Sequence, residues 1–157
     1  MTVEDFETDH PAQLAAMQAV LPGLADRDPL LASRLIEVPS ENALASRIDR
    51  DYDPDVLGEH RDALLNKLAE VLRDFWTQAY AALPIVAYVD SAEAMGQRAW
   101  RNAVLAMACR AGLPEALDWA SQQYDHAVCM TERLGALRML VWHDAPDRQA
   151  RLDDFAQ

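Results

Sequence analysis

The sequence has few of the residues that interrupt helices, and it has no long apolar run. Its 157 residues include only 5 glycines and 8 prolines, whereas 51% are hydrophobic and alanine and leucine are abundant. This composition is typical of packed helices rather than of sheets or disordered chains. No apolar run approaches the roughly 20 residues that cross a bilayer, so the sequence predicts no membrane-spanning helix.

Basic residues are also scarce. The chain carries 14 lysines and arginines against 26 aspartates and glutamates, which gives a net charge of −12, and the acids are scattered along the chain. Such a field repels phosphate backbones and anionic lipids. We therefore expect neither a nucleic-acid partner nor a membrane partner.

Cysteine is limited to two residues, Cys109 and Cys129. One lies inside a helical run and the other just before another run, and no basic-then-apolar leader follows Met1. In a chain without an export signal, such cysteines are more often buried thiols than a disulfide. We therefore expect a reducing, cytoplasmic location.

Helix start and stop signals recur along the chain. Capping residues precede several stretches of apolar periodicity, in some cases followed by proline at the first helical position: Asp28, Ser40, Asp53 and Ser91. Pro22 with Gly23 predicts the end of the first helix, and Gly112 predicts a left-handed stop. The longest stretch runs from Pro54 to Leu83, and as one helix it would be about 45 Å long.

These signals predict an all-α fold of seven or eight helices, packed as antiparallel hairpins in an irregular, HEAT-like or α-superhelical array. Residues 85–89, IVAYV, are the only candidate for a strand. A chain of 157 residues is near the usual size of one domain and buries roughly two thirds of its unfolded surface. We therefore predict a single helical domain over residues 1–157.

Residues 125–140, DHAVCMTERLGALRML, place His126, Cys129 and Glu132 at three-residue intervals. On one helix face these side chains would offer nitrogen, sulfur and oxygen ligands to zinc. That geometry requires a continuous helix, whereas Thr131 followed by Glu132 is typical of a helix start. We interpret the stretch as a junction between two helices, with a zinc site as the alternative.

The other motifs indicate no catalytic residue. The sequence contains no HExxH, no GxSxG, no phosphate-binding glycine loop and no CxxC. His60 lies on the predicted long helix, and His143 has Asp144 and Asp147 nearby, as expected for a loop histidine beside a capping acid. We therefore predict no catalytic, cofactor-binding or metal-binding residue in this chain.

Two further sets of residues have structural interpretations. Polar residues midway along an otherwise apolar helix predict buried hydrogen bonds: Arg98, Arg101 and Asn102. Large aromatic residues within or at the ends of predicted helices are expected in a core or between domains: Trp76, Trp100, Trp119 and Trp142.

Three segments resemble bacterial aminopeptidase N, the alanyl-aminopeptidase group of zinc metallopeptidases. DPLLASRLIEVPSENALASRID followed by DPDVLGEHRDALLNKLAEVLRDFWTQAY is similar to a helix, an LPSE-type turn and a DP-capped long helix. GQRAWRNAVLAMACRAG matches a family helix at Arg98, Arg101, Asn102 and Leu105. QQYDHAVCMTERLGALRML matches a Met-Thr-acid element, although Val128 and Cys129 stand where the family has asparagines. The resemblance covers residues 28–157.

The resemblance implies a part of the C-terminal all-helical domain of that family. The HExxH motif, the GAMEN loop and the zinc ion of the full-length enzyme belong to an earlier domain. The matching segment packs around the active-site chamber and restricts peptide access, so its implied partners are the remaining domains and the peptide substrates. We expect the isolated chain to bind no catalytic zinc and to have no peptidase activity.

Three possibilities remain. The chain is either a piece of a larger enzyme or a free-standing helical interaction module that holds a protein or peptide partner. A small enzyme that uses His126, Cys129 or His143 is the third possibility.

Overall fold

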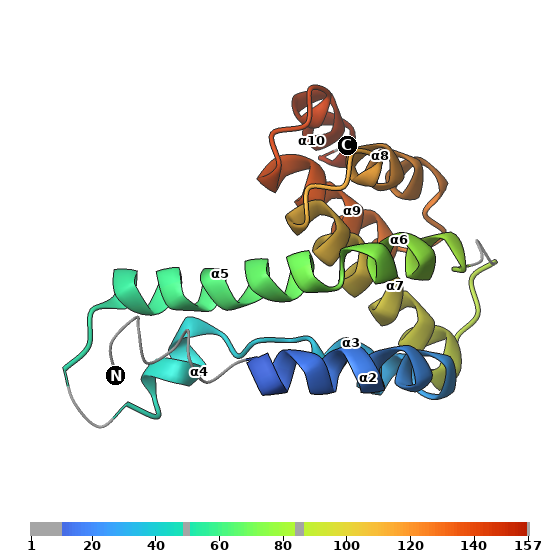
Figure 1. Ribbon diagram of the computed structural model, residues 1–157. Coiled ribbons are helices and arrows are strands. Elements are labelled where there is room, and N and C mark those ends of the chain that lie inside the picture. Colours follow the sequence, from blue (N-terminus) through green and yellow to red (C-terminus); the bar gives the residue numbers. More distant parts are fainter. Residues whose placement is uncertain (1–10, 49–50, 84–86, 157) are drawn as a thin grey trace.

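The computed structural model describes residues 11–48, 51–83 and 87–156. These residues form nine helices and no strand (Figure 1). The all-α prediction is confirmed, with one helix more than expected. The helices are α2 (Pro11–Arg27), α3 (Pro29–Leu35), α4 (Glu41–Ala45), α5 (Pro54–Val71), α6 (Arg73–Ala81), α7 (Ala92–Arg110), α8 (Ala116–His126), α9 (Met130–Trp142) and α10 (Arg148–Phe155). Part of the candidate strand, residues 84–86, lies outside the described residues, and residues 87–90 form no regular element.

The predicted capping residues begin the helices as expected. Four side chains each accept a hydrogen bond from a backbone N–H of the following first turn: Asp28, Ser40, Asp53 and Ser91. Gly112 follows α7 with a φ of 62°, a left-handed conformation that costs other residues more than glycine. These local signals therefore define where α3, α4, α5 and α7 begin and where α7 ends.

The predicted 45 Å helix is wrong, because the chain breaks at Leu72 into α5 and α6. Leu72 has φ −103° and ψ 20°, outside the helical range. The indole Nε1 of Trp76 donates to the backbone carbonyl of Ala69 at 3.1 Å, and the Gln18 side chain donates to the carbonyl of Val71 at 3.1 Å. Side chains thus bond carbonyls at the break, which is a recognised cause of helix kinks.

The predicted stop at Pro22 is also wrong, because α2 continues through it to Arg27. Pro22 itself is exposed, and the apolar stripe continues beyond it. Leu21 is fully buried, and Leu24 and Ala25 pack against the core. Packing of this stripe therefore outweighs the usual cost of a proline in a helix interior.

Helix α7 lies at the centre of the array and contacts α3, α5, α6, α8 and α9. In Figure 1, α2 and α3 lie beside one another, and α8, α9 and α10 form the other end of the molecule. The largest fully buried side chains include Trp76, Leu105 and Leu140, contributed by α6, α7 and α9. This packing confirms the irregular helical array. None of the described helices is both long and apolar enough to span a bilayer.

Candidate functional site

The three residues with zinc-ligand spacing lie at a helix junction. His126 is the last residue of α8, Cys129 is the residue before α9, and Glu132 lies in the first turn of α9. The predicted junction is therefore confirmed, and the three residues do not share a continuous helix. The expected cap at Thr131 is two residues late, since Cys129 is the residue that precedes α9.

Glu132 of α9 forms an ion pair with Arg101 of α7. Their side chains approach to 3.7 Å, and the residues are only 9% and 8% exposed. The thiol of Cys129 lies 3.8 Å from the second carboxylate oxygen and donates to it. Because the carboxylate already has these partners, the trio does not fit zinc, and the described residues contain no group of three or more His, Cys, Asp or Glu side chains arranged to hold a metal.

Asn102 and Gln123 extend this contact into a network between α7, α8 and α9. The Gln123 amide donates to Asn102 Oδ1 at 2.8 Å and to the Glu132 carbonyl at 3.0 Å. The Asn102 amide donates in turn to the Thr131 carbonyl at 3.0 Å. Arg101 is thus paired in a buried position and Asn102 is bonded in a half-buried one, whereas Arg98 donates to the Val89 carbonyl outside this network.

Gly135 allows α9 to approach α7 at Asn102. A β-carbon at position 135 would lie 2.4 Å from Asn102 Oδ1, well inside van der Waals contact. The Asn102 side chain cannot swing away freely, because both ends of its amide are bonded. Sequence reasoning missed Gly135 and Gln123; a glycine in the interior of a predicted helix was the available signal.

Tyr80 and Trp119 form the outer part of the same network. Their rings stack with centroids 4.6 Å apart and an interplanar angle of 10°. The Tyr80 hydroxyl donates to the Trp119 carbonyl at 3.2 Å and contacts Gln123 Oε1 at 3.4 Å. Burial raises the pKa of Tyr80 to about 12, so the hydroxyl stays protonated and acts as a donor.

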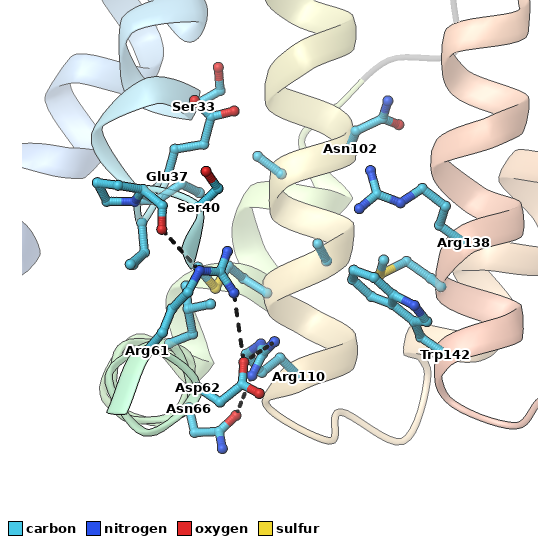
Figure 2. A pocket seen from close by; sticks show the side chains of 18 of the residues that line it. Ser33, Glu37, Ser40, Arg61, Asp62, Asn66, Asn102, Arg110, Arg138 and Trp142 are labelled. Atoms are coloured by element: carbon cyan, nitrogen blue, oxygen red, sulfur yellow. Dashed lines mark hydrogen bonds and ion pairs between the residues drawn. The ribbon is translucent and has the colours of Figure 1, made fainter. Parts of the chain in front are cut away.

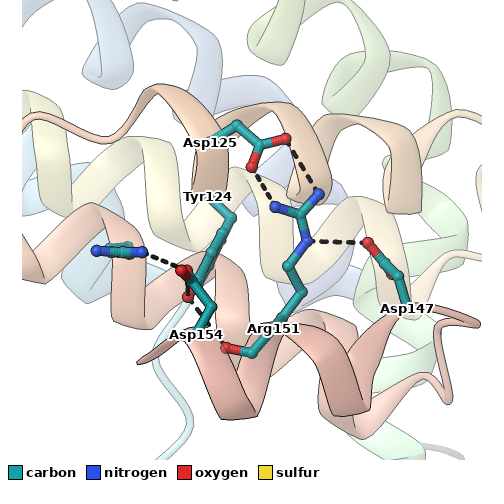
Figure 3. A network of polar contacts seen from close by, with 6 residues as sticks. Tyr124, Asp125, Asp147, Arg151 and Asp154 are labelled. Carbon is teal, nitrogen blue, oxygen red and sulfur yellow. Dashed lines mark hydrogen bonds and ion pairs between the residues drawn. The ribbon is translucent and has the colours of Figure 1, made fainter. Parts of the chain in front are cut away.

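A second network attaches α10 to α8 and α9 (Figure 3). The Tyr124 hydroxyl donates to Asp154 Oδ2 at 2.8 Å. The guanidinium carbons of Arg133 and Arg151 lie over the Tyr124 ring, 4.7 and 5.1 Å from its centroid. Arg151 also pairs with Asp125 and Asp147. Every charged group in this cluster has a partner, so its role is to fix the terminal helix.

A groove of about 1340 Å³ lies between α3, α4, α5, α7 and α9 (Figure 2). Ala99, Ala103 and Ala106 of α7 line it, and their small side chains leave the helix backbone accessible. The three alanines are spaced four and three residues apart, which places them on one face of α7, and each is partly buried.

Arginines dominate the charged lining of the groove. Arg61 and Arg110 share a single carboxylate, Asp62, at 3.8 and 3.3 Å. Arg61 also donates to the Pro39 carbonyl, and Arg110 donates to the Asn66 side chain at 2.8 Å. One acidic group therefore faces two guanidinium groups at this end of the groove.

Arg138 and Trp142 form the opposite wall, on α9. The guanidinium of Arg138 lies 4.9 Å from the centroid of the Trp142 ring, and Trp142 is 65% exposed. The core prediction is confirmed for Trp76 and Trp100, which are 0% and 4% exposed. Trp142 does not lie in the core of this chain, because the α9 face that carries it lines the groove, and for this residue the expectation of packing between domains stays a prediction.

The other two candidate histidines, His60 and His143, lie on α5 and directly after α9. His60 is half-buried on α5, and His143 lies at the end of the groove. Burial lowers the pKa of His143, aided by the charge of Arg110 and opposed by Asp144. Asp144 itself pairs with Arg148.

Comparison with known proteins gives three findings. Residues 2–157 match a family described as "Domain of unknown function (DUF3458_C) ARM repeats". Aminopeptidase N of Escherichia coli (strain K12) is 32% identical over 128 residues, which cover 82% of this chain and 15% of that protein. A crystal structure of Legionella pneumophila aminopeptidase A in complex with aspartic acid matches with a TM-score of 0.75 at 22% identity, over 92% of this chain and 18% of that one. The chain thus spans less than a fifth of either relative, and the structural match shows the fold alone.

Proposed function

The chain belongs to the DUF3458_C family of ARM-repeat domains, and we propose from this premise that it walls the active-site chamber of an aminopeptidase N-like enzyme. It is a C-terminal helical portion of an aminopeptidase N-family protein. In the proposed role it restricts which peptides reach the chamber. The catalytic zinc and the removal of N-terminal residues belong to another domain of the whole protein.

One observation carries the proposal: the family match extends over residues 2–157, and an aminopeptidase N is 32% identical over most of this length. The polar network adds a physical reason, because it ties α7, α8 and α9 together through Arg101, Gln123 and Glu132. Helices that are cross-linked in this way keep their relative positions, as a wall of the proposed chamber requires. The His126, Cys129 and Glu132 trio does not fit a zinc ion, and in the proposed division of roles another domain of the whole protein carries out the hydrolysis.

Peptide access is tested in a full-length enzyme that carries this domain. Ala103→Phe places a large side chain on the floor of the groove without touching the polar network. We expect kcat/KM for peptides of about ten residues to fall severalfold, while hydrolysis of an alanine anilide stays unchanged. Equal rates on long peptides in the variant and the parent enzyme would contradict the proposed role.

Activity of the isolated chain is a separate test. We expect purified chain to release no aniline from an alanine anilide, with or without added zinc. Chelator-sensitive turnover, with stoichiometric metal measured in the same preparation, would assign the chemistry to this domain and refute the division of roles.

A free-standing interaction module is the second candidate, favoured by the groove and its exposed Trp142. Sequencing the native reading frame separates the two. An HExxH motif upstream in the same frame supports the enzyme portion, and a frame limited to these helices supports the module.

We also propose a reducing, cytoplasmic location. Both cysteines are free, and Cys109 is buried with its thiol 3.8 Å from the Ala116 carbonyl. Immunoblotting of fractionated cells checks the location, and recovery of the protein outside the cytoplasm would contradict it.

A further inference from the structure

The groove concentrates positive charge in an acidic molecule. Four of the 14 lysines and arginines of the chain line it, against three of the 26 aspartates and glutamates. The ratio of basic to acidic groups is therefore reversed between the groove and the whole chain. The lining acids are Glu37, Glu41 and Asp62, so the groove carries a net excess of one positive charge in a chain of net charge −12. A local excess of positive charge in a concave surface favours negatively charged ligands.

The arginines of the groove are incompletely neutralised. Arg34 pairs with Glu37, but Arg61 and Arg110 share Asp62. Within the described part of the chain, Arg138 forms no ion pair with a carboxylate. The Arg138 guanidinium lies over the face of the Trp142 ring. The lining thus holds guanidinium charge that the chain's own acids do not balance.

Trp142 orients Arg138 for ligand binding. The guanidinium lies against the indole, and Figure 2 shows the Arg138 side chain extending from α9 toward α7, between Asn102 and Trp142. Stacking on an aromatic ring leaves the planar N–H donors free at their edge, where a carboxylate accepts two parallel hydrogen bonds. The exposed indole adds apolar surface beside this fork, a combination enriched at binding hot spots.

We infer that the groove binds an extended acidic peptide segment, with Arg138 holding a carboxylate and Trp142 packing against the adjacent apolar side chain. The floor formed by Ala99, Ala103 and Ala106 lets the peptide main chain lie close to α7. The inference rests on the proposed function only for the source of the peptide, which would be a substrate that approaches the chamber.

The net charge of the chain selects a peptide over other anions. A nucleic acid or an anionic bilayer would bring many negative charges close to a molecule of net charge −12. A peptide brings only one or two carboxylates, and Arg138, which forms no ion pair within the described part of the chain, is the group placed to receive one of them. The groove volume of about 1340 Å³ accommodates several residues of an extended chain.

Calorimetry and NMR on the purified 157-residue chain test the inference. The probe is the acetylated and amidated hexapeptide Ala-Glu-Ala-Glu-Phe-Ala, and its neutral counterpart has glutamine in place of glutamate. We expect the acidic probe to bind, to shift the indole signal of Trp142 and to weaken with added salt. The neutral probe should bind at least about tenfold more weakly, which corresponds to about 1.4 kcal/mol.

Two arginine variants locate the site. Arg138→Gln should weaken binding of the acidic probe at least about tenfold. Arg98→Gln is the matched control, because Arg98 also stacks on an aromatic ring, Tyr88, at 5.1 Å but does not line the groove. It should change the affinity less than twofold. Circular dichroism confirms that both variants keep their helices.

Several results would overturn the inference: no binding of the acidic probe, equal binding of the neutral probe, or equal losses in the two arginine variants. Sedimentation that shows a dimer dissolved by Arg138→Gln would assign the groove to a second copy of the chain instead. These outcomes are distinct from failure of the proposed function. If the isolated chain binds the acidic probe but Ala103→Phe leaves long-peptide hydrolysis unchanged, the site stands and the chamber role fails.

Discussion

Replacing Gly135 with alanine tests the closest packing in the polar network. The new β-carbon would lie 2.4 Å from Asn102 Oδ1. To relieve this contact, Asn102 must give up its bonds to the Thr131 carbonyl and to Gln123, or α9 must move away from α7. Two lost hydrogen bonds cost about 2 kcal/mol, and overpacking costs about 1 to 3 kcal/mol more. Higher helix propensity of alanine returns about 1 kcal/mol.

The net expectation is a loss of about 3 kcal/mol of unfolding free energy, or about 6 to 12 °C in Tm for a domain of this size. Urea unfolding followed by circular dichroism measures it. Gly23→Ala is the matched control, because a β-carbon there meets nothing within 4 Å and the position lies inside α2. That variant should be slightly more stable than the parent chain.

A double variant identifies the cause of the loss. In a chain that already carries Asn102→Ala, the obstructing side chain is absent, so Gly135→Ala should cost nothing or stabilise the helix. A chain with Gly135→Ala as stable as the parent, or a cost unchanged by Asn102→Ala, would refute the assignment of Gly135 to this close approach.

Three further predictions concern buried or titrating groups. Glu132→Gln should lower the unfolding free energy by about 3 kcal/mol, because it removes the carboxylate that pairs with the buried guanidinium of Arg101. Urea unfolding measures the loss, and an unchanged urea midpoint would contradict the prediction. Burial raises the pKa of Cys109 to about 12, so iodoacetamide at pH 8 should label Cys129 first, and mass spectrometry showing the reverse order would refute the assignment. The pKa of His143 in the folded chain lies below its ordinary value of 6.5, so folding favours the neutral imidazole. Its contribution to the unfolding free energy should therefore fall as the pH drops through 6.5 toward the folded pKa. The urea midpoint of His143→Gln should accordingly change less between pH 7.5 and pH 5.5 than the midpoint of the parent chain.

The parts of the fold that sequence predicted correctly are those with local causes. Ser40 and Asp53 bond amides two or three residues ahead, so the sequence around each cap contains the whole interaction. The break at Leu72 has a different origin, because it involves a bond between Trp76 and the Ala69 carbonyl and a second bond from Gln18. Gln18 is 53 residues from the carbonyl that it contacts, and no local pattern reports such a contact.

The same distinction applies to the groove. The spacing of Arg138 and Trp142, four residues apart, places them on one helix face, so their contact was readable from the sequence. Whether another helix covers that face was not readable, because this depends on how α9 packs against α7 and α8. Aromatic residues at helical spacing indicate core by default, and Trp142 departs from this default only through the arrangement of the helices.

The residues that carry the family resemblance serve packing rather than chemistry. Arg101, Asn102 and the Thr131-Glu132 pair are all consumed by contacts between α7, α8 and α9. A motif in which every polar group is satisfied within the chain has no donor or acceptor left for a substrate. Functional contacts must therefore come from groups that the fold leaves unpaired, and Arg138 on the uncovered face of α9 meets that condition. The most chemically suggestive stretch thus holds α7, α8 and α9 together, and a less conspicuous arginine, one helix turn before an exposed tryptophan, is the group available to a ligand.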